Sequence, residues 1–190
     1  MHKRMKYEQR RPFKATALIT ISVSLVLTAC AHAGQQESVD MPKAELCLAS
    51  SNHQQGVVSS TMAHERARVQ AELALTEDDR ARGLMHREHL EPEEGMLFYY
   101  PNSQYRSFWM FHTLIPLDIA YLADDGEILQ IITMEPCESE SPFRCKGYQS
   151  DAQARAALEL NAGAFVELGV DVGDYVLESN CQQAPWAEGW

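Results

Sequence analysis

Residues 107–126 read SFWMFHTLIPLDIAYLADDG, a largely apolar and aromatic stretch with few polar side chains. The pattern predicts one buried strand over 108–113 and a second over 117–123. Pro116 separates the two because proline cannot continue a hydrogen-bonded ladder. The DDG sequence at 124–126 is typical of a tight hairpin turn. We therefore expect the chain around this stretch to be a buried β-structure.

The few polar side chains of this stretch predict a site. Asp118 is flanked by two apolar residues, so its carboxylate must be solvated at a strand end or paired with donors. We expect Asp118 to lie within hydrogen-bond reach of a cationic or amide donor, with Arg87 as first candidate and His112 as second, in a concavity bordered by Trp109. The alternative is that Arg87 and Asp118 form an internal ion pair with a purely structural role.

Residues 1–29 have the pattern of a signal peptide. Six basic residues precede an uncharged, mostly apolar run at 15–29, which is too short to span a bilayer comfortably. The sequence LTAC at 27–30 resembles the bacterial lipobox, in which cleavage precedes a cysteine that is then acylated, here Cys30. We therefore expect an exported protein, lipid-anchored in the cell envelope. Because Ala31 replaces the aspartate associated with inner-membrane retention, we expect the outer membrane facing the periplasm, if the source is Gram-negative.

The alternative is an ordinary secretory signal, which leads to the same exported compartment. Beyond residue 29 we expect a flexible tether over 30–63, a single domain over 64–180 and a tail over 181–190. From residue 30 onward the chain holds 10 Lys+Arg and 26 Asp+Glu, a net charge of −16 with His neutral. This charge repels nucleic acid, so we expect no nucleic-acid partner. We further expect a monomer without a cofactor.

Five cysteines in an exported chain leave an odd one, and Cys30 accounts for it. Cys137 and Cys145 lie eight residues apart in a loop-like stretch, and we predict a disulfide between them. Cys47 and Cys181 would then join the two ends of the domain. Other pairings and a metal site stay open, although the closely paired ligands typical of zinc are absent.

Alternating apolar residues predict five further strands, at 66–75, 96–100, 127–134, 154–160 and 175–178. Thr76 is placed to cap a short helix that ends at Gly83. Asn161 is placed to cap a second short helix at 162–168. These elements predict an α+β, β-rich domain: a small, curled or barrel-like, largely antiparallel sheet with two short helices.

A series of short motifs occurs in order along the chain: Thr76 with GLMHR at 83–87, GMLF at 95–98, FWM at 108–110, Thr113 with IPLD at 115–118, DG at 125–126, LELNAG at 158–163 and GD at 173–174. Over about 67–177 this order closely resembles the family called domain of unknown function 192. The resemblance implies a small β-rich domain, often exported, of unestablished activity. The family usually shows Trp-Met-x-Asn-Thr, and here His112 takes the place of the asparagine. An imidazole can replace an amide as donor, but it titrates near neutrality.

The first functional hypothesis is a non-catalytic binding module for a small polar ligand or a protein partner. Its ligand-binding residues would be Arg87, Trp109, His112, Thr113 and Asp118. The alternative is a hydrolase that uses Asp118 and His112 as acid and base. The chain shows no Cys or Ser nucleophile signature, so we expect binding rather than catalysis.

A further alternative is copper handling by Met85, Met96 and Met110 with His86 or His112, because thioethers suit Cu(I). Buried methionines at strand spacing are more often core residues, and no closely spaced Met cluster occurs. His86 and His89 could also bind a metal from one helical face, but such histidines are more often part of a solvated connector.

Overall fold

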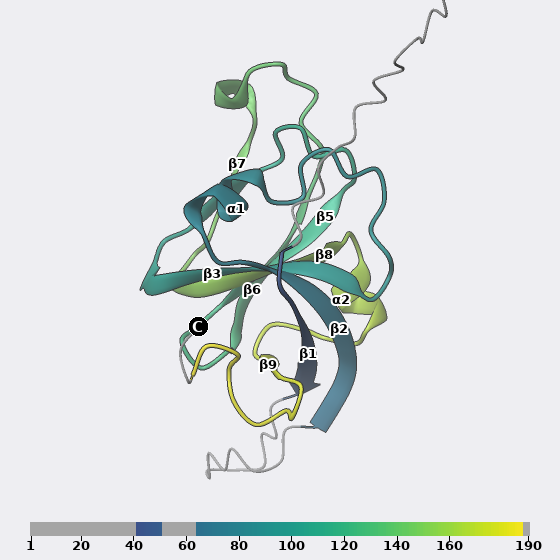
Figure 1. Cartoon of the computed structure of the whole chain (residues 1–190), viewed down its shortest axis with the longest axis vertical. Coiled ribbons are helices and arrows are strands. Elements are labelled where there is room, and N and C mark those ends of the chain that lie inside the picture. The colour runs from purple at the N-terminus through teal and green to yellow at the C-terminus, as the bar shows by residue number, and fades with distance from the viewer. Residues whose placement is uncertain (1–40, 51–63, 188–190) are drawn as a thin grey trace, which may run out of the picture. The chain divides into compact units, whose positions relative to one another are not determined.

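The structure, a computed structural model, describes residues 41–50 and 64–187, which form a curved β-sheet with short helices at its margins (Figure 1). In chain order the elements are β1 Lys43–Ser50, β2 His64–Ala74, α1 Glu77–Arg82, β3 Glu94–Gln104, β4 Ser107–Trp109, β5 Leu117–Leu122, β6 Ile128–Met134, the 3-10 helix η1 Pro142–Arg144, β7 Gly147–Gln149, β8 Ala154–Asn161, α2 Ala164–Glu167 and β9 Tyr175–Glu178. The signal sequence and Cys30 lie outside these residues. None of the helices in the described part is long and apolar enough to cross a membrane.

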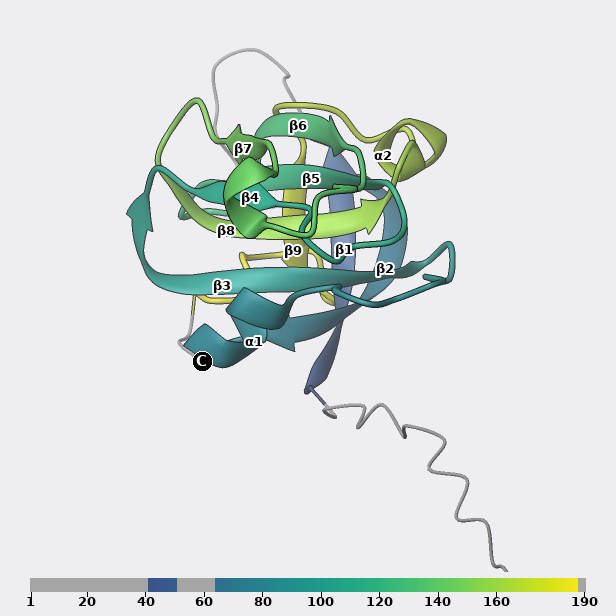
Figure 2. The ribbon, with the colours of Figure 1, turned by 90° about the horizontal axis from the view of Figure 1, so that it is seen from above.

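Seven strands form the main sheet in the order β6-β5-β8-β3-β2-β1-β9, and β4 pairs with β7 in a small second sheet. All neighbours are antiparallel except β2 and β3. Figure 2 shows β5, β8 and β3 side by side while β1 and β9 run across them, so the sheet curls strongly. A bridge between Glu127 and Tyr175 brings the edges together at one point. The predicted α+β, β-rich fold is confirmed, although the sheet does not close into a barrel.

The central strand β8 is buried on both faces and separates two hydrophobic clusters. Leu158 and Leu160 belong to the cluster that includes Phe165 and residues of β1 and β2. Ala157 belongs to the other cluster, in which Met96 packs with residues of β5 and β7. Because successive side chains of a strand point to opposite faces, the two sets alternate along β8. The near-continuous apolar sequence of β8 follows from this double burial.

The predicted tether and tail are both shorter than expected. β1 lies inside the predicted tether and pairs with β2 and β9, with residues 46–48 wholly buried. In the predicted tail, Ala184 and Trp186 are buried, and the indole nitrogen of Trp186 donates to the carbonyl of Asp124 at 2.7 Å. Short apolar segments in polar surroundings gave too weak a periodicity to predict these contacts.

Two local predictions also need correction. The strand expected over 108–113 ends at Trp109, and the chain then turns, with His112 in a left-handed conformation at φ 54°. Asn161 does not cap α2, because it is the last residue of β8 and its side chain donates to the carbonyl of Leu90 at 2.9 Å. α2 begins instead after Gly163, whose φ is 85°.

The short helix α1 begins and ends as predicted. The hydroxyl of Thr76 accepts from the amide of Asp79 at 3.1 Å, and the carboxylate of Asp79 accepts from the amide of Thr76 at 3.3 Å. This capping box satisfies amides that the first turn leaves free. Gly83 follows the helix at φ 49°, a region in which glycine is not strained. The cap fixes the position of α1 beside β3, where the candidate site lies.

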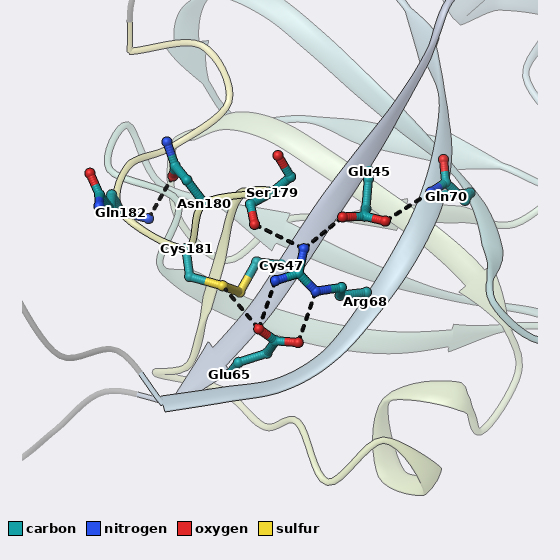
Figure 3. A network of polar contacts seen from close by, with 9 residues as sticks. All are labelled: Glu45, Cys47, Glu65, Arg68, Gln70, Ser179, Asn180, Cys181 and Gln182. Carbon is teal, nitrogen blue, oxygen red and sulfur yellow. Dashed lines mark hydrogen bonds and ion pairs between the residues drawn. A yellow bond between two sulfur atoms is a disulfide. The ribbon is translucent and has the colours of Figure 1, made fainter.

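Both predicted disulfides are present, Cys47–Cys181 and Cys137–Cys145. The first joins β1 to the segment after β9, in a region crossed by a polar network around Arg68 (Figure 3). The guanidinium of Arg68 donates to Glu65 at 2.8 and 2.9 Å and to Glu45 at 2.6 Å. Covalent and polar contacts therefore hold the two ends of the domain together.

Candidate functional site

An acidic side chain, Glu159, lies on a buried face of the central strand β8. It is 4% exposed, and its direct neighbours across the ladder are Met96 on β3 and Ile119 on β5. This burial raises the pKa of the Glu159 carboxyl from its ordinary value of 4.5 to about 8. Ionisation is disfavoured because the surroundings cannot solvate the charge. At neutral pH the group is therefore mostly a protonated carboxylic acid, able both to donate and to accept hydrogen bonds.

The Glu159 carboxyl makes no hydrogen bond or ion pair with any residue that the structure describes. The Glu159 oxygens are nevertheless not fully enclosed. A fully enclosed side-chain oxygen or nitrogen without a partner occurs in the described residues at Arg155 Nε and not at Glu159. Glu159 instead lines a pocket of about 80 Å³. Buried polar groups are normally paired, so an unpaired one facing a hollow points to water or a ligand as its partner.

Aromatic side chains and residues with hydroxyl groups surround this pocket, which we call the Glu159 pocket. Its lining includes Phe98, Tyr100, Ser107, Phe108, Trp109 and Thr113, with residues 80–85 from α1 and the loop that follows. The rings of Phe98 and Phe108 meet edge to face with centroids 4.9 Å apart. Trp109 is 47% exposed, so its ring offers a surface to a ligand as well as to the domain. The pocket thus combines aromatic rings with a larger share of polar surface, to which hydroxyl, guanidinium and carboxyl groups contribute.

Two cations at or near the pocket, Arg80 and Arg106, are engaged by the protein itself, whereas Arg82, which also lines the pocket, is exposed. Arg80 donates to the carbonyls of Leu75 at 2.6 Å and Tyr99 at 3.0 Å. The guanidinium carbons of Arg80 and Arg106 lie 4.9 and 3.8 Å from the centroid of the Tyr100 ring. These contacts fix the wall made by Tyr100, and neither arginine is paired with Glu159.

A second hollow, of about 250 Å³, lies next to the Glu159 pocket. Ser107, Phe108 and Trp109 line both hollows, while Cys145 and Gly147 complete the second. The Cys137–Cys145 disulfide closes the loop from which Cys145 comes. β4 therefore forms a wall shared by two adjoining hollows.

The family model of DUF192, described as an uncharacterized ACR, matches residues 58–177. The chain belongs to the DUF192 family. The match includes Glu159 and the described residues that line the Glu159 pocket. The predicted resemblance is thereby confirmed.

Two crystal structures resemble this DUF192 chain. One, described as a candidate transcription regulator from Sinorhizobium meliloti 1021, is 31% identical with a TM-score of 0.59, over 73% of this chain and 95% of the other. The second, a protein of unknown function from Novosphingobium aromaticivorans DSM 12444, is 28% identical with a TM-score of 0.54, over 72% and 85%. A comparison with curated proteins found no match.

Two of the five predicted site residues of the DUF192 domain line the Glu159 pocket, and the other three do not. Trp109 and Thr113 line the Glu159 pocket. Arg87 forms an ion pair with Glu72 instead of Asp118. The rings of Phe111 and His112 stack with centroids 3.7 Å apart. The ligand-binding role of the five residues stays a prediction, but the expected pairing of Asp118 with Arg87 or His112 is wrong.

Asp118 is held by donors from two other segments of the DUF192 domain. It is 3% exposed, and one carboxylate oxygen accepts from the hydroxyl of Thr133 at 2.7 Å. The other accepts from the backbone amide of Gly163 at 2.8 Å. Asp118 therefore joins β5 to β6 and to the start of α2, which is a structural role. The predicted hydrolase pair of Asp118 and His112 is not assembled.

We expect Asp118→Asn to lower the free energy of unfolding by about 1–3 kcal/mol, because a neutral amide replaces the carboxylate and loses the charge-assisted hydrogen bonds from Thr133 and Gly163. Urea unfolding measures the change, with Asp151→Asn as a control at an exposed aspartate. Ligand binding at the Glu159 pocket should be unchanged in the folded variant. An Asp118→Asn protein as stable as the wild type would contradict the structural role.

Sequence reasoning missed Glu159 although a signal was present. An acid between Leu158 and Leu160 in a predicted strand raises the same question as Asp118. The alternation of 154–160 favoured a half-exposed strand, on which a glutamate faces water. Only the packing of β8 between two hydrophobic clusters shows that both of its faces are covered.

Proposed function

We propose that the chain is an exported lipoprotein whose DUF192 domain binds a small polar ligand in the Glu159 pocket without catalysing a reaction. The observation that carries the proposal is the buried Glu159 carboxyl, which has no protein partner and faces a hollow. A ligand that hydrogen-bonds this acid removes the cost of an unpaired polar group.

The walls of the pocket indicate the chemistry of the ligand. Phe108 and Trp109 favour a flat or apolar face, whereas Ser107 and Thr113 add hydroxyl groups that donate and accept. A protonated Glu159 suits a neutral ligand with a hydrogen-bonding edge. We therefore favour a small neutral molecule, polar on one side and apolar on the other, over a strongly charged one.

The lipid anchor is the other part of the proposal. It rests on the LTAC sequence at 27–30, which predicts acylation of Cys30 after removal of 1–29. Anchored in this way, the domain would meet its ligand in the envelope, facing the periplasm if the source is Gram-negative. The two disulfides are consistent with an oxidising compartment.

The transcription-regulator description of the Sinorhizobium relative does not guide this proposal. From residue 30 onward the chain has 26 acidic and 10 basic residues, and so large an acidic excess repels DNA phosphates. A binding module with no nucleic-acid partner agrees better with the charge.

The test is a thermal-shift screen of small metabolites and sugars against the wild type, followed by calorimetry of each compound that stabilises it. Glu159→Leu keeps roughly the size of the side chain but removes its donor and its acceptor, so we expect at least about tenfold weaker binding, the loss of one strong hydrogen bond. Trp109→Ala should also weaken binding, and Glu140→Gln, at an exposed acid, should not. Equal affinity of the wild type and Glu159→Leu for every compound that binds would contradict the proposal.

A further inference from the structure

Two histidine rings from separate segments lie against each other beside the Glu159 pocket. The ring centroids of His86 and His112 are 4.8 Å apart and their planes are tilted by 40°. His86 belongs to the loop after α1, and His112 to the turn after β4. The backbone amide of His86 donates to the carbonyl of His112 at 2.7 Å, which holds the two residues together.

Both histidines have an unusual backbone conformation. Their φ angles are 62° and 54°, in the left-handed region that non-glycine residues seldom adopt. Asparagine, aspartate and histidine enter this region more readily than other side chains. Asparagine could therefore adopt the same backbone conformation at both positions. The left-handed conformation alone does not explain why both residues are histidines. Strained backbone of this kind gathers at functional sites.

The ring nitrogens of this pair are available for a ligand. His86 and His112 are both exposed, and neither imidazole hydrogen-bonds to another residue in the described part of the chain. His89 differs, because its ring bonds to Glu91 at 3.0 Å. Phe111 stacks on the His112 ring and restricts the orientations open to it.

We propose that His86 and His112 together bind one divalent transition-metal ion. Imidazole nitrogens bind such ions at about 2.0–2.1 Å, which places two ring centroids about 4.5–5.2 Å apart for nitrogen–metal–nitrogen angles of about 90–109°. The observed 4.8 Å falls within this range. The 40° tilt is compatible with two imidazoles on one ion, and the soft χ2 torsion of histidine lets a nitrogen of the His86 ring turn toward the His112 ring.

The ligands indicate which ion would bind best. Imidazole suits Cu²⁺, Ni²⁺ and Zn²⁺, and Cu²⁺ is the strongest binder of the series. Water completes the coordination because both rings are exposed. Met96 and Met110 are 0% and 1% exposed in one core cluster, whereas the two imidazoles are exposed, so the ion proposed here is bound by the histidines and not by buried thioethers.

Another cluster of potential ligands in the described residues is less suitable. Cys47, Glu65 and Cys181 lie within 4.8 Å of one another, but the two sulfur atoms form a disulfide and offer no thiolate (Figure 3). The carboxylate of Glu65 also forms an ion pair with Arg68. The histidine pair carries the proposal because its nitrogens have no such partners.

The test is a Cu²⁺ titration of the full chain by calorimetry, with pulsed electron paramagnetic resonance to count the coordinated imidazoles. We expect one site with two imidazoles in the wild type. His86→Asn or His112→Asn should weaken this site at least about tenfold, since each removes one of its two protein bonds. Asparagine tolerates the left-handed backbone, so both variants should keep the wild-type circular dichroism spectrum.

His89→Asn is the matched control, because it removes a nearby exposed histidine outside the pair, and its affinity should equal that of the wild type. Copper bound elsewhere on the chain is common to all variants and cancels in the comparison. Unchanged Cu²⁺ affinity in the double variant His86→Asn/His112→Asn would overturn the proposal. A single imidazole on the wild-type ion would do the same without any variant. Neither result would bear on the Glu159 pocket.

Discussion

Raising the pH from 4.5 to 8 should lower the free energy of unfolding of the wild type by roughly 3–5 kcal/mol relative to Glu159→Gln. Burial raises the pKa of Glu159 to about 8 in the folded state, against 4.5 for the ordinary group. Between these values the folded state keeps a proton that the unfolded state has lost, so stability falls as the pH rises. Below pH 4.5 both states are protonated, and above pH 8 both are ionised, so the difference levels off at each end.

Urea unfolding at several pH values measures this effect. Taking the difference from Glu159→Gln removes the contributions of the other ionisable groups, which both proteins share. A parallel pH dependence in the two proteins would mean that Glu159 ionises with an ordinary pKa. Glu140→Gln should follow the wild type, because Glu140 is exposed.

Loss of the Cys47–Cys181 disulfide should destabilise the domain far more than loss of Cys137–Cys145. The two bridges span 134 and 8 residues. Chain-entropy estimates give about 5 kcal/mol for the longer loop and about 2 kcal/mol for the shorter. The larger value is a considerable fraction of the total stability of a domain of this size.

Denaturant unfolding of the double variants Cys47→Ala/Cys181→Ala and Cys137→Ala/Cys145→Ala compares the two bridges under the same conditions. Each variant is the control for the other, since both lose two cysteines. Equal losses, or a larger loss for the short loop, would show that closing the two ends of the chain is not what stabilises the fold.

Local sequence signals predicted much of this fold. The capping box at Thr76 and the DDG turn at 124–126 depend on neighbouring residues, so their chemistry is readable along the chain. The strands 117–123 and 175–178 were found by apolar pattern and appear as β5 and β9. The cysteine pairs followed from compartment and count.

Features that depend on distant parts of the chain were not predictable in this way. β1 has a short apolar core, and only its pairing with β2 and β9 makes it a strand. Asp118 was expected to bind a cationic or amide donor, with Arg87 and His112 as the candidates, but a backbone amide and a hydroxyl from other segments satisfy it. Glu159 became visible as a site only when hydrophobic clusters were seen on both faces of its strand. Tertiary context decided all three.

The protonation of Glu159 is the centre of this account, and carbon-13 NMR of the side-chain carboxyl groups tests it most directly. The Glu159 resonance is assigned by its absence from the Glu159→Gln spectrum and followed from pH 3 to 10, roughly the range over which carboxyl groups in proteins titrate. The account predicts a midpoint at about 8, well apart from the exposed acids. A midpoint near 4.5 would show a solvated or paired carboxylate, and would contradict the claim that Glu159 is a buried, unpartnered acid facing a binding pocket.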